Sequence, residues 1–157
     1  MARRKRKVVV IGAGSVGASY IYALLQTGMA EEVALIDLDR DRVEGEVMDL
    51  SHGLQFIPPV HIKAGQYADC TDASLIVITA GAKQSPGQSR ADLIRKNAKI
   101  VAAICDQISE YESEAVIVMV TNPVDALTQV ALERLGWPRQ RVIGSGTVLD
   151  TARFKFL

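Results

Sequence analysis

Short runs of β-branched and aliphatic residues alternate with longer segments of helical period along the whole chain. This alternation is typical of βαβ units, in which helices join parallel strands. The pattern predicts strands over Lys7–Ile11, Glu32–Leu38, His61–Ala64, Leu75–Ala80, Ala115–Thr121 and Val142–Ile143. It predicts helices over Val16–Thr27, Asp41–Leu54, Arg90–Glu110 and Pro123–Leu135, with a further helix starting at Asp150.

Six strands joined by crossovers predict an α/β fold, a doubly wound parallel sheet with helices on both faces. If the second half begins at Leu75, the expected strand order is 3-2-1-4-5-6. Ligands of such sheets bind at the carboxyl ends of the strands, where the order reverses. Functional residues are therefore expected directly after strands.

Composition narrows the class of protein. The chain has 157 residues, the size of one domain, and its 18 basic residues balance 18 acidic ones, which argues against a nucleic-acid partner. Cys70 and Cys105 form no C-x-x-C pair, and two histidines are too few to complete a common zinc site, so we expect no metal. Reduced thiols suggest a cytoplasmic location.

The amino-terminal residues could be mistaken for a signal peptide or a membrane anchor. A basic run, Arg3–Lys7, precedes an apolar stretch from Val8 to Leu25. Three glycines interrupt this stretch, and no small-residue cleavage site follows it. We therefore expect a solvated lead-in to the first strand and no membrane segment.

A glycine-rich hexapeptide, G-A-G-S-V-G, lies between the first strand and the first helix. In a G-x-G-x-x-G turn, backbone N–H groups and the helix dipole face a pyrophosphate. Asp37 ends the second strand twenty residues after Gly17, where a carboxylate accepts hydrogen bonds from the adenosine ribose and repels a 2′-phosphate. The pattern favours NAD over NADP. The expected cofactor contacts are Gly12, Gly14, Ser15, Val16, Gly17 and Asp37.

Four further segments carry a resemblance to a known family. They are Asp49–Gly53, Thr79–Arg90, Thr121–Asp125 and Asp150–Arg153. With the glycine motif, they make essentially the whole chain resemble the lactate and malate dehydrogenases, and it is similar to the nucleotide-binding half of the L-lactate dehydrogenases. Thr79–Arg90 corresponds to the family's active-site lid, and we expect its Gly81–Ser89 part to be mobile.

The resemblance implies roles for individual residues. Arg90 matches the arginine that polarises the substrate carbonyl, and Arg153 matches the one that grips the carboxylate through two hydrogen bonds. Asn122 matches an amide that contacts substrate and the nicotinamide ribose, and the Asn122–Pro123 peptide is expected to be cis as in relatives. Gln84 stands where a neutral side chain favours pyruvate and an arginine favours malate. Further cofactor contacts implied are Ala80, Gly81 and Lys83.

The family's proton donor is a histidine in a Gly-Glu-His-Gly-Asp segment, which these 157 residues do not contain. Asp150 matches the carboxylate that orients this histidine. His52 and His61 are not expected to replace it. Lys155 aligns with a residue that helps some bacterial members bind a sugar bisphosphate.

The resemblance implies that residues 1–157 are a dinucleotide-binding domain that ends just inside the next helix, without the substrate domain. We expect it to be inactive alone. A malate dehydrogenase domain, a stand-alone or engineered cofactor-binding module, and one half of a split enzyme remain alternatives. We also expect a homo-oligomer, paired through the second helix by Val43, Val47, Leu50 and Leu54. Phe154, Phe156 and Leu157 add apolar surface.

Overall fold

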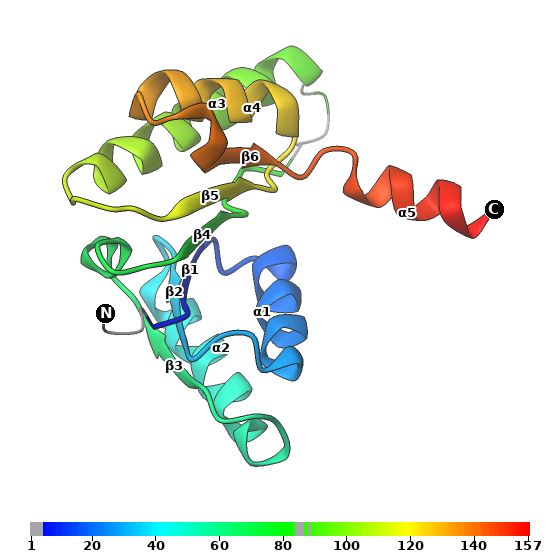
Figure 1. The fold of residues 1–157 in the computed structure, drawn as a ribbon. Coiled ribbons are helices and arrows are strands. Elements are labelled where there is room, and N and C mark those ends of the chain that lie inside the picture. Colours follow the sequence, from blue (N-terminus) through cyan, green and yellow to red (C-terminus); the bar gives the residue numbers. More distant parts are fainter. Residues whose placement is uncertain (1–4, 84–86, 88) are drawn as a thin grey trace.

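The computed structural model describes residues 5–83, 87 and 89–157, and these form one parallel sheet flanked by helices (Figure 1). The sheet has six strands in the order β3-β2-β1-β4-β5-β6, so the predicted fold class and strand order are confirmed. The strands are β1 (Lys7–Ile11), β2 (Glu32–Ile36), β3 (His61–Ala64), β4 (Leu75–Ile78), β5 (Val116–Met119) and β6 (Val142–Gly144).

Helices cover both faces of the sheet, α1 and α2 on one side and α3 and α4 on the other (Figure 1). The helices are α1 (Ser15–Thr27), α2 (Arg40–His52), α3 (Arg90–Ser109), α4 (Val124–Leu135) and α5 (Val148–Phe156). Short 3₁₀-helices are η1 (Leu54–Phe56), η2 (Tyr67–Cys70) and η3 (Arg139–Arg141). Glycine ends both α1 and α4: Gly28 and Gly136 adopt φ of 65° and 64°, the left-handed conformation that other residues rarely take.

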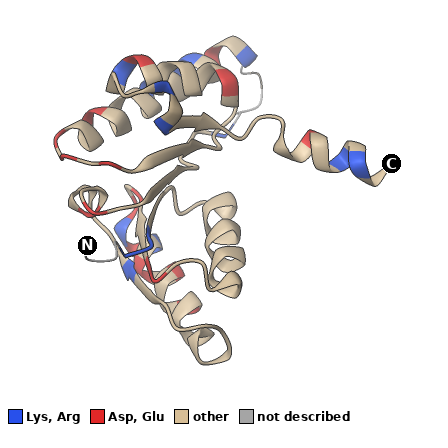
Figure 2. Cartoon of the chain, in the orientation of Figure 1, with Lys and Arg blue, Asp and Glu red and all other residues tan. Residues whose placement is uncertain are grey.

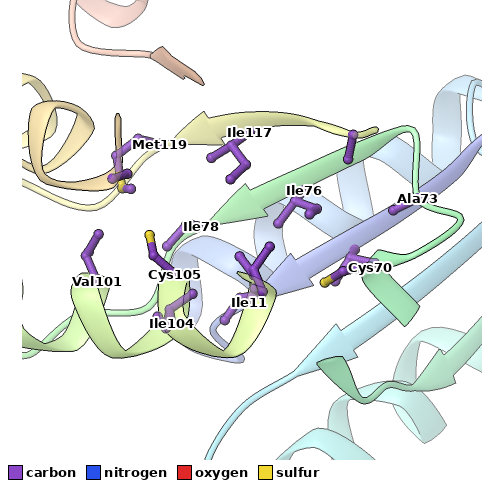
Figure 3. Close-up of a cluster of buried hydrophobic side chains, with 14 of the residues drawn as sticks. Ile11, Cys70, Ala73, Ile76, Ile78, Val101, Ile104, Cys105, Ile117 and Met119 are labelled. Atoms are coloured by element: carbon purple, nitrogen blue, oxygen red, sulfur yellow. The ribbon is translucent and has the colours of Figure 1, made fainter. Parts of the chain in front are cut away.

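The core is divided by the sheet into two layers, because successive side chains of a strand point to opposite faces. In β1, Val9 and Ile11 pack toward α3 and α4, whereas Val8 and Val10 pack toward α1 and α2. Figure 3 shows the first layer, where Ile11 lies among side chains of β4, β5 and α3. Burial on both faces explains why the central strands β1, β4 and β5 carry runs of apolar residues rather than an alternating pattern.

Several strand ends were placed too far along the chain. The second strand was predicted to reach Leu38, but pairing with β1 stops where Ile36 meets Ile11, and Leu38 is fully exposed. The fourth and fifth strands likewise end at Ile78 and Met119. In each case, the residues after the last paired position turn out of the sheet and form the loops described below.

The apolar stripe of the second helix, which was predicted to pair subunits, also packs within the domain. Val43 is buried, and Val47, Leu50 and Leu54 are partly buried against the core layer that also contains α1. The helical stripe therefore packs on the domain's own sheet. An amphipathic pattern alone cannot distinguish these two uses, because both require one apolar face.

A cluster of ionised side chains lies at the amino-terminal end of β1. The Lys7 side chain is 4% exposed, and its ammonium lies 2.8 Å from Asp69 and 2.6 Å from Asp72. Lys63 makes a second contact with Asp69, at 2.7 Å. Although desolvation opposes ionisation, hydrogen bonds from Lys63 and Lys7 lower the pKa of Asp69 to about 2. This charge cluster links β1 and β3 to η2.

Helix α5 extends away from the sheet, and every residue from Val148 to Leu157 is exposed (Figure 1). In Figure 2 the ribbon of α5 is coloured at both acidic and basic residues. None of the helices in the described residues combines the length and apolar character needed to cross a membrane.

Candidate cofactor and substrate site

Most predicted site residues follow β1, β2, β4 and β5, and the structure brings these four turns together. Parallel strands all end at one edge of a sheet. There, the N–H of Gly12 donates to Ile36 at 2.7 Å, and the N–H of Ala80 donates to Ile11 at 2.9 Å. Thr121 donates to Ile78 in the same way, at 3.2 Å. Each turn is thus held to the end of the neighbouring strand.

The turn after β1 needs glycine at two positions for steric reasons. Gly12 has a φ of 118°, and a Cβ there would lie 2.5 Å from the Ala80 nitrogen. A Cβ at Gly17 would lie 1.9 Å from the Gly12 oxygen, so the first turn of α1 approaches the loop too closely for any side chain. The glycines at these positions therefore reflect backbone packing between β1, α1 and β4.

Gly14 differs from the other two glycines because a Cβ there would meet nothing within 4 Å. It is the N-cap of α1, makes no side-chain cap hydrogen bond, and is followed by exposed Ser15 and Val16. The first turn of α1 has no acidic residue, and Figure 2 shows the whole helix free of charge. A space beside uncapped N–H groups, without negative charge, fits the diphosphate of a dinucleotide.

Asp37 lies directly beside this turn. One carboxylate oxygen accepts a hydrogen bond from the Ala13 N–H at 2.7 Å, and the other accepts from the Asp39 N–H at 3.1 Å. The side chain is half-buried. These two bonds fix the carboxylate between the ends of β1 and β2, where it can also accept from ribose hydroxyls.

Tyr67 is a residue that the sequence reasoning missed. It lies three residues after β3, is half-buried and packs against the core layer of α3. Burial raises the pKa of Tyr67, with contributions from Cys70 and from the negative charge of Asp37. Its position just beyond a third strand was the signal in the sequence that could have identified it.

The segment after β4 packs against the turn after β5. A Cβ at Gly81 would lie 2.5 Å from the Thr121 methyl carbon, and the Thr121 hydroxyl donates to the Ala80 oxygen at 2.8 Å. Lys83 is exposed at the end of this segment. Gln84 lies outside the described residues, as does part of the loop Gly81–Ser89 that was expected to be mobile.

Arg90 and Asn122 follow β4 and β5, which form the second half of the sheet edge at the carboxyl ends of the strands. The Asn122–Pro123 peptide is cis, as predicted, and Asn122 is exposed. Arg90 is the first residue of α3 and is exposed, after the N-cap Ser89, whose hydroxyl accepts from the Asp92 N–H at 3.1 Å. Both predicted substrate contacts are therefore exposed after β4 and β5.

The structure does not assemble the remaining predicted residues with them. Asp150 and Arg153 lie on the exposed helix α5, where Arg153 donates to Asp150 at 3.2 Å. His61 begins β3, at the opposite edge of the sheet from the glycine turn, and His52 ends α2. Neither histidine follows a strand end at the site.

A parallel sheet with this order, a glycine turn after its first strand and a fixed carboxylate after its second defines the class of doubly wound dinucleotide-binding domains. A family profile described as lactate/malate dehydrogenase, NAD binding domain, matches residues 6–144. The chain belongs to this family, and NAD is confirmed as its cofactor.

Individual relatives agree with this assignment. An L-lactate dehydrogenase of Treponema denticola is 50% identical over 156 residues, which are 99% of this chain and 50% of that protein. L-lactate dehydrogenase 1 of Clostridium acetobutylicum is 46% identical over 155 residues, with the same two shares. The chain thus spans about half the length of the curated relatives it matches.

Solved structures confirm the fold. A crystal structure of a lactate dehydrogenase from a Medee basin deep-sea metagenome library matches with a TM-score of 0.94 and 47% identity, covering 98% of this chain and 49% of that one. The minor L-lactate dehydrogenase of Enterococcus mundtii, in a ligand-bound form, matches with a TM-score of 0.95 and 41% identity over the same shares.

Proposed function

We propose that residues 1–157 form the NAD(H)-binding domain of an L-lactate dehydrogenase, whose reaction interconverts L-lactate and pyruvate. The relatives named L-lactate dehydrogenase, which match nearly the whole chain, support this proposal. The observation that carries it is the Asp37 carboxylate held by the Ala13 N–H inside the glycine turn. When bound, NAD carries the hydride that this reaction moves.

The residues that follow β1 and β2, on the first half of the sheet edge, are proposed to hold the diphosphate and the adenosine ribose of the cofactor. Gly12, Gly14, Ser15, Val16 and Gly17 receive the diphosphate, because the space at Gly14 adjoins the N–H groups of α1. Asp37 accepts from the ribose of the adenosine. On the other half, Ala80, Gly81, Lys83 and Asn122 are proposed to contact the cofactor toward its nicotinamide end.

The substrate contacts are proposed to be Gln84, Arg90, Asn122 and Arg153. A guanidinium at Arg90 would polarise the 2-oxo carbonyl, and one at Arg153 would hold the carboxylate through paired hydrogen bonds. Gln84 favours pyruvate over a dicarboxylic acid, because it offers no charge for a second carboxylate. Asp150 would orient a histidine proton donor that residues 1–157 do not contain.

Calorimetric titration of the 157-residue chain with NADH and NADPH tests the cofactor part of this proposal. We expect NADH to bind, with micromolar or weaker affinity, because only one domain contacts it, and to bind more tightly than NADPH. If neither nucleotide bound at millimolar concentration, or if NADPH bound more tightly, the proposed role of Asp37 would be wrong.

We also propose that the chain self-associates and that it works in the cytoplasm. Both cysteines are free thiols, which suits a reducing compartment. Phe154, Phe156 and Leu157 are exposed on α5 and form apolar surface that a second copy could cover. We expect sedimentation at high micromolar concentration to show oligomers, and Phe154→Ser/Phe156→Ser to dissociate them. A monomeric parent chain would contradict the proposed association.

A further inference from the structure

Asn97 is a polar residue on the buried stripe of α3. It is 2% exposed, and the other buried residues of this stripe are Val101, Ile104, Cys105 and Ile108. An amide in such a position is costly unless its donor and acceptor both find partners. The hydrogen-bond partners of Asn97 lie outside α3, and they indicate what the side chain does.

The oxygen and the nitrogen of the Asn97 side-chain amide each form a hydrogen bond with a turn at the site. Its Oδ1 accepts from the Ala82 N–H at 2.8 Å, and its Nδ2 donates to the Asn122 carbonyl at 2.9 Å. Ala82 belongs to the segment after β4, and Asn122 to the turn after β5. One buried side chain therefore joins two loops that are forty residues apart in sequence.

The packing around this amide leaves little freedom. A Cβ at Gly81 would lie 3.4 Å from Asn97 Oδ1 and 2.5 Å from the Thr121 methyl carbon, so the two turns are in direct contact beside the amide. An aspartate at position 97 could accept from Ala82 but could not donate to Asn122 while ionised. A leucine could do neither. The geometry requires a side chain that donates and accepts at once.

We propose that Asn97 is a positioning residue that locks the turn after β4 to the Asn122 turn and so places both for the nicotinamide end of bound NAD(H). This inference rests on the proposed function and adds to it a buried residue that does not itself touch the cofactor. Its effect is predicted to be confined to the nicotinamide half, because the Gly12 turn and Asp37 make their own hydrogen bonds.

The variants Asn97→Asp and Asn97→Ala, titrated with NAD⁺ and with ADP-ribose, test this. ADP-ribose has the same adenosine and diphosphate but no nicotinamide. At neutral pH we expect Asn97→Asp to lower the affinity for NAD⁺ roughly tenfold and to leave the affinity for ADP-ribose unchanged. Below the pKa of the introduced carboxyl, which burial should raise, the protonated group can donate to Asn122, and NAD⁺ affinity should return. The affinity of Asn97→Ala for NAD⁺ should stay low at every pH.

A second measurement needs no cofactor. Amide hydrogen exchange at Ala82 should be faster in Asn97→Ala than in the parent chain, and Asn97→Asp should keep the protection, because its carboxylate still accepts from Ala82. Gln107→Glu, which adds the same charge on an exposed position of α3, serves as the matched control and should change neither exchange nor affinity.

The outcomes separate this inference from the proposed function. A parent chain that binds neither ligand would overturn the proposed function. A parent chain that binds both equally, or an Asn97→Asp variant that loses both ligands equally or neither, would overturn the positioning role. An Asn97→Asp affinity that does not recover on acidification would also overturn it, since the donor to Asn122 would then be irrelevant.

Discussion

At the residue scale, the Asp37 carboxylate combines two functions that a substitution can separate. It accepts a hydrogen bond from the Ala13 N–H, which orders the glycine turn, and its charge is proposed to oppose a 2′-phosphate. We expect Asp37→Ala to lower the affinity for NADH roughly tenfold and to raise the affinity for NADPH relative to NADH, both measured by calorimetry. Asp37→Asn is the matched control, because its amide oxygen can still accept from Ala13.

Asp37→Asn should therefore shift the preference toward NADPH with a smaller loss of NADH affinity than Asp37→Ala. If both variants kept the parent's preference for NADH, the discrimination would have to come from another residue. If both lost affinity equally, the hydrogen bond to Ala13 would contribute nothing to binding.

At the element scale, strand β1 is held at its amino-terminal end by the buried ammonium of Lys7. Removing this partner leaves the carboxylates of Asp69 and Asp72 without their shared cation. Because Asp69 keeps its contact with Lys63 and Asp72 is mostly exposed, we expect Lys7→Met to lower the free energy of unfolding by about 1 to 3 kcal/mol in urea denaturation, the contribution of charged hydrogen bonds. Arg95→Met removes an exposed pair with Asp92 and should cost less than about 1 kcal/mol.

The acid dependence of stability should change in the same variant. The pKa of Asp69 is lowered in the folded state to about 2, so its contribution is present above the unfolded value of 3.8 and is lost as the pH falls toward 2. In Lys7→Met this lowering is smaller, and the free energy of unfolding should fall less steeply over that range. An acid profile parallel to the parent's would show that Lys7 does not control Asp69.

The helices and strands also show which structural features the sequence pattern could predict and which it could not. Residues Val8–Ile11 are apolar because both faces of a central strand are covered, and that pattern predicted the strand Lys7–Ile11 correctly. The stripe on α2 packs on the domain's own sheet, and the predicted subunit pairing stays a prediction, because burial on the sheet and burial on a partner give the same period. Asn97 was missed because only its partners, Ala82 and Asn122, distinguish a bridging amide from an ordinary polar substitution, and those contacts arise from tertiary packing.

At the scale of the whole molecule, the described residues present only part of the proposed reaction centre. Arg90 and Asn122 lie exposed at the edge of the sheet, while Arg153 lies on α5 and bonds to Asp150 instead of approaching them. Hydride transfer to a 2-oxo acid also needs a proton donor, and the described histidines lie away from this edge. Binding and turnover are therefore expected to be separate properties of residues 1–157.

We accordingly predict that the purified 157-residue chain binds NADH but does not reduce pyruvate at a detectable rate. General acid catalysis supplies a factor of about 10² to 10⁴, and the loss of substrate enclosure removes orientation and water exclusion in addition. The measurement is pyruvate-dependent oxidation of NADH, followed by absorbance after rigorous removal of host dehydrogenase. Oxidation that persisted after this purification and disappeared in Arg153→Ala would mean that a group within these residues donates the proton, and that α5 folds back to the crevice when substrate binds.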